Sequence, residues 1–435
     1  MIRPTTRLVI LLLAWLLLAV AAAFVPALVK TWVICAALLA AALVLDGIWV
    51  RQLKQIEAER KVNHNLPINS WSDVKLRLRH HHRRTLHMTL HDHVPNSFRY
   101  RQQPQPLSLP TDKMAEISYP VKPQQRGNAR FAALDLLITS PFGLWRRRLL
   151  LPLESTVRVY PNFAEISHYT LLATDNRLSQ MGVKRRQRRG EGNDFHQLRE
   201  YRDGDSLKQV DWKATARHRK VISREYQDER DQQILFMVDC GRRMRHKENG
   251  QEHLDQALNA MLLLSYVAVR QGDAAGFISF AGDERWCAPQ KGQGAVNQLL
   301  NQTFDLPSTM DAADYLGTAR RLMSLQRRRS LIVLMTNTRD EDQQELLTAV
   351  QLLSRRHLVV LADLQEPALQ QSIEQDVNTL DSALQYHSVY DYLQRRRSLH
   401  ESLGHSGALC MDTTAEQLPV KLVNQYLDIK RAGRL

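Results

Sequence analysis

The stretch Ile234-Leu235-Phe236-Met237-Val238, followed directly by Asp239, decides the fold of the C-terminal half of the chain. Five consecutive apolar residues are typical of a strand that is buried on both faces of a sheet. Similar short apolar runs recur at residues 276–280, 331–335, 358–362 and 408–411. The sequence therefore predicts a mostly parallel sheet in this half.

Apolar residues recur at helical spacing between these strands. One stretch carries Leu254, Leu258, Met261 and Leu262, and a later one carries Leu346, Val350 and Leu353. Strands that alternate with helices are typical of a doubly wound sheet, so we expect an α/β domain over residues 234–435. Ligands of such domains bind at the carboxyl ends of the strands, which draws attention to Asp239 and Asn337.

Two apolar segments lie near the N-terminus, at residues 8–25 and 31–50. At about 1.5 Å per residue the first reaches roughly 27 Å, enough to cross a membrane. Cationic residues flank both segments: Arg3, Arg7, Arg51, Lys54, Arg60 and Lys61. The positive-inside rule then predicts a two-helix transmembrane hairpin over residues 1–62, with both chain ends in the cytoplasm. The alternative is a signal peptide cleaved near residues 21–23.

Residues 63–165 change to a period of two. Val74, Leu76 and Leu78 alternate with charged residues, and Leu86, Met88 and Leu90 follow the same pattern. Short strands separated by proline and glycine predict a small β-sandwich. Six histidines fall between His80 and His93. On a strand His87, His91 and His93 share one face, which leaves a metal site or a solvated basic face as interpretations.

The formal charge of +14 is unevenly distributed over the 435 residues. The first 231 residues carry a net charge of +16 and the last 204 carry −2. A uniformly basic coat for nucleic acid would not show this gradient, so no nucleic-acid partner is expected. The cysteines Cys35, Cys240, Cys287 and Cys410 are far apart and form no CxxC pair, which indicates reduced cytosolic thiols.

Residues 166–233 are densely charged, and opposite charges alternate closely, which predicts ion pairs that hold this segment to a neighbouring domain. Asp203 and Asp205 flank a turn at Gly204, and the pair is either a plain turn or a carboxylate pair for acid/base chemistry. Upstream lies a basic run of Lys184, Arg185, Arg186, Arg188 and Arg189. On a membrane-anchored chain an anionic leaflet is the nearest polyanion, so this run, Arg51 and Lys54 are predicted to lie near the membrane surface.

The charged segment resembles a bacterial membrane family called domain of unknown function 58. The resemblance rests on Tyr201, Arg202, Gly204, Asp205, Asp211, Trp212, Lys213, Arg217, Glu225, Glu229 and Arg230. Arg126-Gly127 and Ser140-Pro141-Phe142-Gly143-Leu144 also look like that family's middle segment. The resemblance implies a location in the bacterial inner membrane, a von Willebrand factor A-like C-terminal domain and partnership with MoxR-type AAA+ ATPases.

The von Willebrand A fold often binds a divalent ion through an Asp-x-Ser-x-Ser loop, a Thr and a further Asp. Here only Asp239 of the loop remains, because Gly241 and Arg243 replace the hydroxyl residues. Thr309 is the candidate for the Thr position, and Asn337 stands at the final Asp position. A cation at Arg243 opposes a hard metal ion that needs oxygen ligands, so no metal is expected.

No nucleotide-binding motif occurs in the sequence, and no cofactor is expected. Cys240 is a separate candidate nucleophile, because Arg242 and Arg243 lie close by in the sequence and would favour its thiolate. The main hypothesis is a non-enzymatic, membrane-anchored scaffold or adaptor that works with a MoxR-type ATPase in protein maturation or envelope stress. The alternative is an enzyme of unknown class that uses Asp203 and Asp205 or Cys240.

Overall fold

A computed structural model describes residues 2–53, 56–82, 84–161, 194–202, 209–227, 232–248 and 250–434. The chain divides into two compact units, Met1–Tyr160 and Pro161–Leu435, and each is described by itself. Lys54, Asp203, Gly204, Asp205, Glu229, Arg230 and the basic run at residues 184–189 lie outside the described residues.

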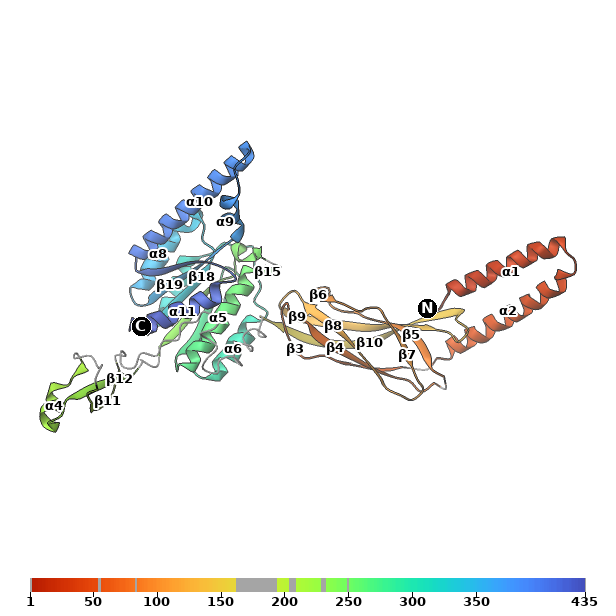
Figure 1. Cartoon of the computed structure of the whole chain (residues 1–435), viewed down its shortest axis with the longest axis horizontal. Coiled ribbons are helices and arrows are strands. Elements are labelled where there is room, and N and C mark those ends of the chain that lie inside the picture. Colours follow the sequence, from red (N-terminus) through yellow and green to blue (C-terminus); the bar gives the residue numbers. More distant parts are fainter. Residues whose placement is uncertain are drawn as a thin grey trace. The chain divides into compact units, whose positions relative to one another are not determined.

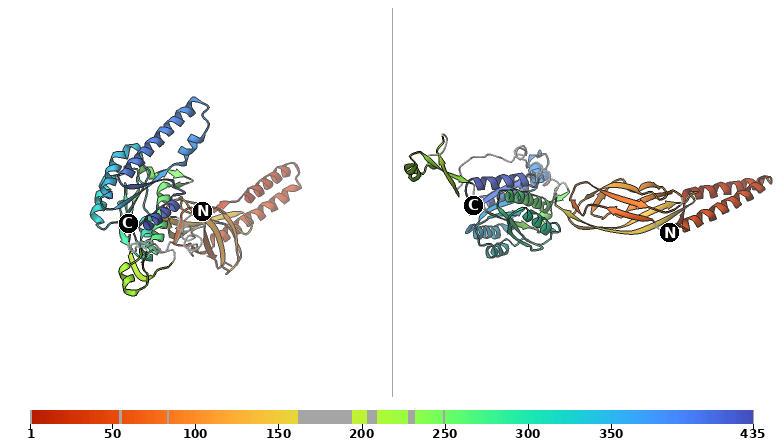
Figure 2. Two further views of the ribbon diagram at one scale, coloured as in Figure 1. Left: turned by 60° about the vertical axis from the view of Figure 1, so that its left-hand side comes forward. Right: turned by 90° about the horizontal axis from the view of Figure 1, so that it is seen from below.

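The first unit begins with two long apolar helices, α1 (Thr6–Phe24) and α2 (Leu28–Arg51). They lie side by side as a hairpin in every view (Figures 1 and 2). The Thr5 hydroxyl caps α1 by accepting a hydrogen bond from the backbone N–H of Leu8, and the Trp15 and Trp32 rings stack 5.4 Å apart. Both helices are long and apolar enough to cross a membrane, which agrees with the prediction from the sequence.

Two antiparallel sheets form the rest of this unit. The first has the order β1-β10-β9-β5-β7, and a short β3 pairs in parallel with β10. Its strands are β1 (Ile2–Pro4), β3 (Asn65–Pro67), β5 (Leu86–Asp92), β7 (Gln105–Leu109), β9 (Gly127–Thr139) and β10 (Trp145–Tyr160). The second sheet has the order β2-β4-β8-β6. Its strands are β2 (Glu57–Lys61), β4 (Ser72–Arg79), β6 (Phe98–Tyr100) and β8 (Ala115–Pro123).

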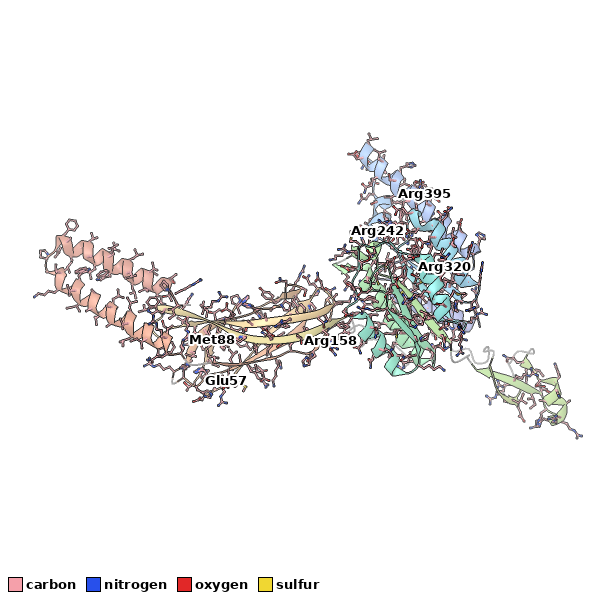
Figure 3. The ribbon with its side chains drawn as sticks, turned by 180° about the vertical axis from the view of Figure 1, so that it is seen from behind. Glu57, Met88, Arg158, Arg242, Arg320 and Arg395 are labelled. Carbon is pink, nitrogen blue, oxygen red and sulfur yellow. The ribbon has the colours of Figure 1, made fainter. Side chains whose placement is uncertain are left out.

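One hydrophobic core holds the two sheets together. It takes Val74, Leu76 and Leu78 from β4 and Leu86, Met88 and Leu90 from β5, so the predicted alternation and the predicted sandwich are confirmed. Figure 3 labels Met88, Glu57 and Arg158 on this part of the chain.

Arg60 is a correction to the sequence interpretation, which placed it among the cations that flank the membrane. Its side chain is fully buried, and its guanidinium pairs with Asp92 and lies 5.0 Å from the centre of the Phe131 ring. The carboxylate of Asp92 also accepts a hydrogen bond from the Tyr119 hydroxyl. Arg60 is therefore part of the interior of the sandwich.

The second unit contains a small module of β11 (Asp194–Glu200), α4 (Trp212–His218) and β12 (Ile222–Gln227), in which the two strands pair antiparallel. The larger part is a mixed sheet of order β17-β16-β13-β18-β19-β20. Its strands are β13 (Gln233–Asp239), β16 (Ala274–Phe280), β17 (Trp286–Gln290), β18 (Leu331–Thr336), β19 (Leu358–Gln365) and β20 (Ala408–Thr414). All neighbouring pairs of this sheet are parallel except β16–β17. The five strands predicted from the sequence are all present, and the edge strand β17 was not predicted.

Helices cover both faces of this sheet. They are α5 (His253–Arg270), α6 (Gln293–Thr303), α7 (Tyr315–Leu325), α8 (Gln343–Ser354), α9 (Pro367–Glu374), α10 (Leu380–His405) and α11 (Leu418–Arg431). Residues of α7, α8 and the C-terminal half of α10 share a core with alternate strand residues, whereas α5, α6 and α11 pack together on the other face. Short elements η2 (Arg242–Arg245), η3 (Asp340–Asp342), β14 (Lys247–Glu248) and β15 (Gln251–Glu252) connect the larger ones.

Candidate functional site

The strand order of the mixed sheet changes direction between β13 and β18, which are neighbours although two other strands of the same sheet, β16 and β17, lie between them in the sequence. In open α/β sheets, ligands bind at the carboxyl ends of the strands next to such a point. β13 ends at Asp239 and β18 ends at Thr336. This edge is therefore the candidate functional site.

Asp239 is buried, and both its carboxylate oxygens have partners within the chain. Oδ1 accepts a hydrogen bond from the backbone N–H of Gly241 at 2.8 Å, and Oδ2 accepts one from the Thr336 hydroxyl at 2.7 Å. The Thr336 hydroxyl also lies 2.8 Å from the hydroxyl of Tyr315. Burial raises the pKa of Asp239 although Thr336 and Gly241 stabilise the carboxylate. The carboxylate thus belongs to a closed internal network.

The other two candidate ion-site residues do not join Asp239. The Thr309 hydroxyl donates to the backbone carbonyl of Ala281 at 2.6 Å. Asn337 is fully buried, and its side-chain amide donates to Glu366 at 2.8 Å. Asn337 follows Thr336 directly, and because successive strand residues point to opposite faces, Thr336 and not Asn337 reaches Asp239. The sequence therefore identified Asp239 but missed its partner.

The residues around Asp239 do not fit a divalent ion. A Cβ atom at Gly241 would lie 2.7 Å from the backbone oxygen of Asp311, so a serine has no room there. The Arg243 guanidinium forms ion pairs with Asp342 and Glu341 of η3. Within the described ranges, no group of three His, Cys, Asp or Glu side chains is placed to hold a metal ion.

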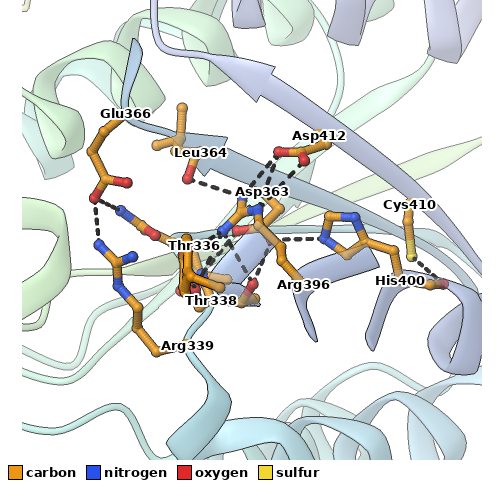
Figure 4. Close-up of polar contacts among 12 residues, drawn as sticks. Thr336, Thr338, Arg339, Asp363, Leu364, Glu366, Arg396, His400, Cys410 and Asp412 are labelled. Atoms are coloured by element: carbon orange, nitrogen blue, oxygen red, sulfur yellow. Dashed lines mark hydrogen bonds and ion pairs between the residues drawn. The ribbon is translucent and has the colours of Figure 1, made fainter. Parts of the chain in front are cut away.

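A second buried carboxylate, Asp363 of β19, organises the neighbouring part of the edge (Figure 4). Its Oδ1 accepts from the backbone N–H of Thr338, and its Oδ2 lies 2.8 Å from both Arg396 Nη2 and His400 Nε2. Burial opposes the charged form of Asp363, but the positive charge of Arg396 and the bond from His400 outweigh it and lower the pKa. Asp363 is thus a buried anion between two basic side chains.

Arg396 connects three strands of this edge. Its guanidinium donates to the backbone carbonyls of Thr338 at 3.2 Å and Leu364 at 3.0 Å, and pairs with Asp412 of β20 at 3.0 Å. Although burial disfavours its charge, Asp363 and Asp412 raise the pKa of Arg396. Arg396 comes from α10, so this helix is joined to the carboxyl ends of β18, β19 and β20.

Glu366 and Arg339 extend the network beyond β19. Glu366 is buried and binds both the Asn337 amide and the Arg339 guanidinium, which lies 4.9 Å from the centre of the Tyr392 ring. Burial opposes the charge of Glu366, but Arg339 and Asn337 lower its pKa. Arg242 and Arg395, labelled in Figure 3, pair with Glu341 and Asp340 of η3.

The thiols near this edge are not arranged as nucleophiles. Cys240 is fully buried, and its thiol lies 3.8 Å from the backbone oxygen of Val238. The Cys410 thiol donates to the backbone carbonyl of His400 at 3.5 Å. Burial raises the pKa of Cys410 to about 11. A histidine and a carboxylate are therefore adjacent here, but neither thiol completes a catalytic set.

The residues of the charged segment that carry the family resemblance, which we call the signature residues, lie in and around the module of β11, α4 and β12, here called the signature module. Asp211 caps α4 by accepting from the backbone N–H of Ala214 at 3.0 Å, and it pairs with Arg224 of β12 at 2.9 Å. Glu200 pairs with Lys220 at 2.6 Å. These bonds lie within the module, so close ion pairs are present among its described residues. The expected contact of the charged segment with a neighbouring domain stays a prediction, because much of the segment lies outside the described residues.

The remaining signature residues lie around the same module. Trp212, Lys213 and Arg217 are exposed on α4, Tyr201 and Arg202 follow β11, and Glu225 lies within β12. Asp203 and Asp205 lie outside the described residues, so their expected role as a carboxylate pair stays a hypothesis.

The clustered histidines of the sandwich have separate partners. His80 is buried and lies 2.8 Å from the backbone oxygen of Leu109, and His87 lies 2.8 Å from the Ser108 hydroxyl. His91 and His93 stack edge to face, with ring centres 5.9 Å apart.

Thr336, Asp363, Glu366, Arg396 and His400 were missed by the sequence interpretation. Asp363 could have been predicted from the sequence, because it follows the apolar run at residues 358–362 just as Asp239 follows residues 234–238. Arg396 and His400 lie in a helix whose polar pattern gave no indication of burial.

Three solved structures illustrate distant similarities to the chain. A Salmonella alpha-2-macroglobulin reacted with methylamine is 17% identical over 24% of this chain and 7% of its own, with a TM-score of 0.19. Proximal thread matrix protein 1 of the mussel byssus is 9% identical over 48% of each chain, with a TM-score of 0.30. An Escherichia coli alpha-2-macroglobulin fragment is 11% identical over 81% of this chain and 55% of its own, with a TM-score of 0.21. The chain thus spans only a small part of the first of these proteins and about half of the other two.

No curated protein matches the chain. The family comparison is more specific, and it covers the last strand residues of β11, the rest of the signature module and the mixed sheet up to the start of α10. Residues 197–382 match the family described as "Protein of unknown function DUF58", which confirms the resemblance seen in the signature.

Proposed function

We propose that the chain is a non-enzymatic, membrane-anchored scaffold whose α/β unit binds a protein partner in the bacterial cytoplasm. The hairpin supports the anchor, because most apolar side chains along both helices are exposed within the part of the chain that the structure describes. Arg3, Arg7 and Arg51 flank the hairpin on one side. The positive-inside rule places that side, and with it the sandwich, in the cytoplasm.

The observation that carries the scaffold proposal is the helical pair α9 and the N-terminal half of α10, residues 367–394, which we call the arm. The arm extends beyond the rest of its unit in Figures 1 and 2. Leu380 is 76% exposed and Leu384 is 58% exposed, and Val377 and Tyr390 are exposed as well. Large apolar side chains on a protruding element indicate a surface that a partner covers.

The charge of the arm defines the chemistry of that partner. Residues 367–394 contain four acidic residues and no Lys or Arg, in a chain of net charge +14. The acidic residues are Glu374, Asp376, Asp381 and Asp391. An anionic leaflet would repel this surface, whereas a protein surface with basic and apolar residues would be complementary to it. The partner in this proposal is a MoxR-type AAA+ ATPase, which the family resemblance suggests, in protein maturation or envelope stress.

The internal bonding of the sheet edge supports a binding role over an enzymatic one. Asp239 and Asp363 are both buried and engaged by residues of the same chain. The strand order and the antiparallel edge strand β17 support a von Willebrand factor A-like fold, which in this proposal works without its usual metal ion.

Crosslinking mass spectrometry on native membranes tests the proposal. The wild-type chain should give crosslinks between the arm and an AAA+ ATPase. The double variant Asp376→Lys/Leu384→Gln should lose them, whereas Asp428→Lys/Leu325→Gln should keep them. The control makes the same changes at an exposed acid and an exposed leucine elsewhere on the unit.

Two results would contradict this proposal at different levels. Equal crosslinking of both variants would show that the arm is not the docking surface. Failure to recover any AAA+ ATPase with the wild-type chain would overturn the assignment of the partner.

A further inference from the structure

The loop between β9 and β10 folds back onto the base of the hairpin, far from it in sequence. Asp46 of α2 is 1% exposed, and its carboxylate accepts from the backbone N–H groups of Phe142 and Leu144, both at 3.2 Å. The indole N–H of Trp145 donates to the backbone carbonyl of Leu43 at 3.2 Å. The loop is therefore fixed against the last turns of α2.

The start of α1 holds the same loop from the other side. The Thr5 hydroxyl donates to the carbonyl of Gly143 at 2.5 Å, and the Thr5 backbone N–H donates to the carbonyl of Leu144 at 3.0 Å. Gly143 has a φ of +71°, and a Cβ atom there would lie 3.1 Å from Arg7 Nη1. Both helices and the loop thus form one bonded structure at this end of the hairpin.

The depth of this structure follows from helix geometry. α2 has 24 residues, which at 1.5 Å per residue span about 36 Å, more than the roughly 30 Å of a hydrocarbon core. Asp46 lies 18 residues after Leu28, the first residue of α2, or about 27 Å along the axis. The loop that Asp46 binds therefore lies at the edge of the hydrocarbon core, where the lipid headgroups begin, when α2 spans the membrane from Leu28.

Exposed arginines and an exposed aromatic side chain lie close to this loop. β1 pairs with β10 and places Arg3 opposite Arg146. Arg3, Arg7, Arg51 and Arg146 are exposed, and none forms an ion pair with a carboxylate within the part of the chain that the structure describes. Phe142, beside Asp46, is 58% exposed. We call these four arginines and Phe142 the collar.

We propose that the collar binds the headgroups of anionic lipids, with Phe142 inserted into the membrane interface. This inference rests on the membrane anchor of the proposed function. Cationic residues are attracted to an anionic leaflet, and aromatic side chains are enriched at the level of the lipid headgroups. The collar combines residues that flank the hairpin with Phe142 and Arg146, which lie more than 90 positions after the end of α2. The sandwich itself therefore takes part in lipid contact.

Photocrosslinking tests where Phe142 lies. The full chain with p-benzoylphenylalanine at position 142 is reconstituted into vesicles of phosphatidylcholine with phosphatidylglycerol and irradiated. Mass spectrometry should find lipid adducts at position 142. The same probe at Tyr100, an exposed residue on β6 of the other sheet, should give none.

Lipid retention tests the arginines. The chain is extracted from the same vesicles in mild detergent, and the ratio of bound phosphatidylglycerol to phosphatidylcholine is measured. The variant Arg3→Gln/Arg146→Gln should lower this ratio by about fivefold for each arginine removed. The control Arg99→Gln/Arg101→Gln, which removes two exposed cations at and just after β6, should leave it unchanged.

Carbonate extraction separates the two ways in which the inference could fail. A chain that carbonate releases from the vesicles would overturn the anchor and the collar together. A chain that stays in the vesicles but gives no lipid adduct at position 142, or the same lipid ratio for both arginine pairs, would overturn the collar and leave the anchor standing.

Discussion

Arg396 of α10 and Asp363 of β19 form a fully buried ion pair, with 2.8 Å between Nη2 and Oδ2. The pair lies where α10 crosses the carboxyl ends of the strands, and Arg396 also binds two backbone carbonyls and Asp412. Removing one member of a buried pair leaves the other charge without compensation. This bond therefore fixes the base of the arm to the sheet.

Arg396→Met should destabilise the α/β unit by about 3–5 kcal/mol, because Asp363 would stay buried without its main cation. Urea denaturation of the full chain in detergent, followed by hydrogen exchange in β18 and β19, measures this loss. Arg397→Met, at the exposed neighbouring position, is the matched control and should change stability by less than about 0.5 kcal/mol. Equal effects of the two substitutions would refute the structural role of Arg396.

Asp46→Ala should loosen the loop between β9 and β10, because the backbone N–H groups of Phe142 and Leu144 would lose their acceptors. An unsatisfied buried donor costs about 1–3 kcal/mol, so exchange of these two amides should accelerate by at least about fivefold. Asp46→Asn keeps one acceptor oxygen and should have a smaller effect. The amide of Val121, within β8, serves as the internal reference. Unchanged exchange at Phe142 in Asp46→Ala would contradict the bonding seen here.

The stability of the α/β unit should fall as the pH drops from about 6.5 towards 4. His253 is fully buried, and burial, together with His246 at a ring distance of 4.7 Å, lowers its pKa to about 4. Between its ordinary pKa near 6.5 and 4, the unfolded chain binds a proton that the folded chain does not. The stabilisation is thus complete above pH 6.5 and is lost through this window.

His253→Phe should reduce the difference between urea midpoints measured at pH 7.5 and pH 4.5. Glu248 also faces His253, at 3.9 Å, and burial raises its pKa, so a part of the pH dependence belongs to it. Burial also lowers the pKa of His357 to about 4, so some dependence should remain in the variant. His387→Phe, at an exposed position of α10, should leave the difference as in the wild-type chain.

Cys410 should react slowly with iodoacetamide in the native chain. Burial raises its pKa from 9.0 to about 11, which lowers the thiolate fraction at neutral pH by about 100-fold. Mass spectrometry of alkylated peptides under native and denaturing conditions measures the ratio. A native rate close to the denatured one would show that the thiol is accessible and activated, and would favour an enzymatic role.

The sequence predicted the elements whose side-chain pattern reflects burial. The five parallel strands of the mixed sheet, the alternation in β4 and β5, and both long apolar helices follow directly from it. β17 was missed because it is a short edge strand with Pro289 and lysine and glutamine around it. The first half of β10 was missed because Arg146, Arg147 and Arg148 interrupt the apolar pattern, and because Leu149, Leu151 and Leu153 pack against the core whereas Leu150 between them is exposed.

The site was less predictable, because its bonds join residues that are far apart in the sequence. Asp239 was found from its place after a strand, but its partner Thr336 lies 97 positions later. Arg60 looked like a membrane-flanking cation, and only the fold shows that Asp92 neutralises it. Local pattern predicts which residues are buried, whereas pairing between distant polar residues depends on strand order and register.

The long strand β10 separates the two ends of the sandwich in the first unit. It starts at Trp145, which is bonded to α2, and ends at Tyr160, the last residue of that unit. Its 16 residues, at about 3.3 Å each, extend roughly 50 Å. The chain therefore leaves the sandwich one full strand length away from the residues that contact α1 and α2. In the proposed membrane-anchored arrangement, this strand length separates the lipid from the point at which the chain leaves the first unit.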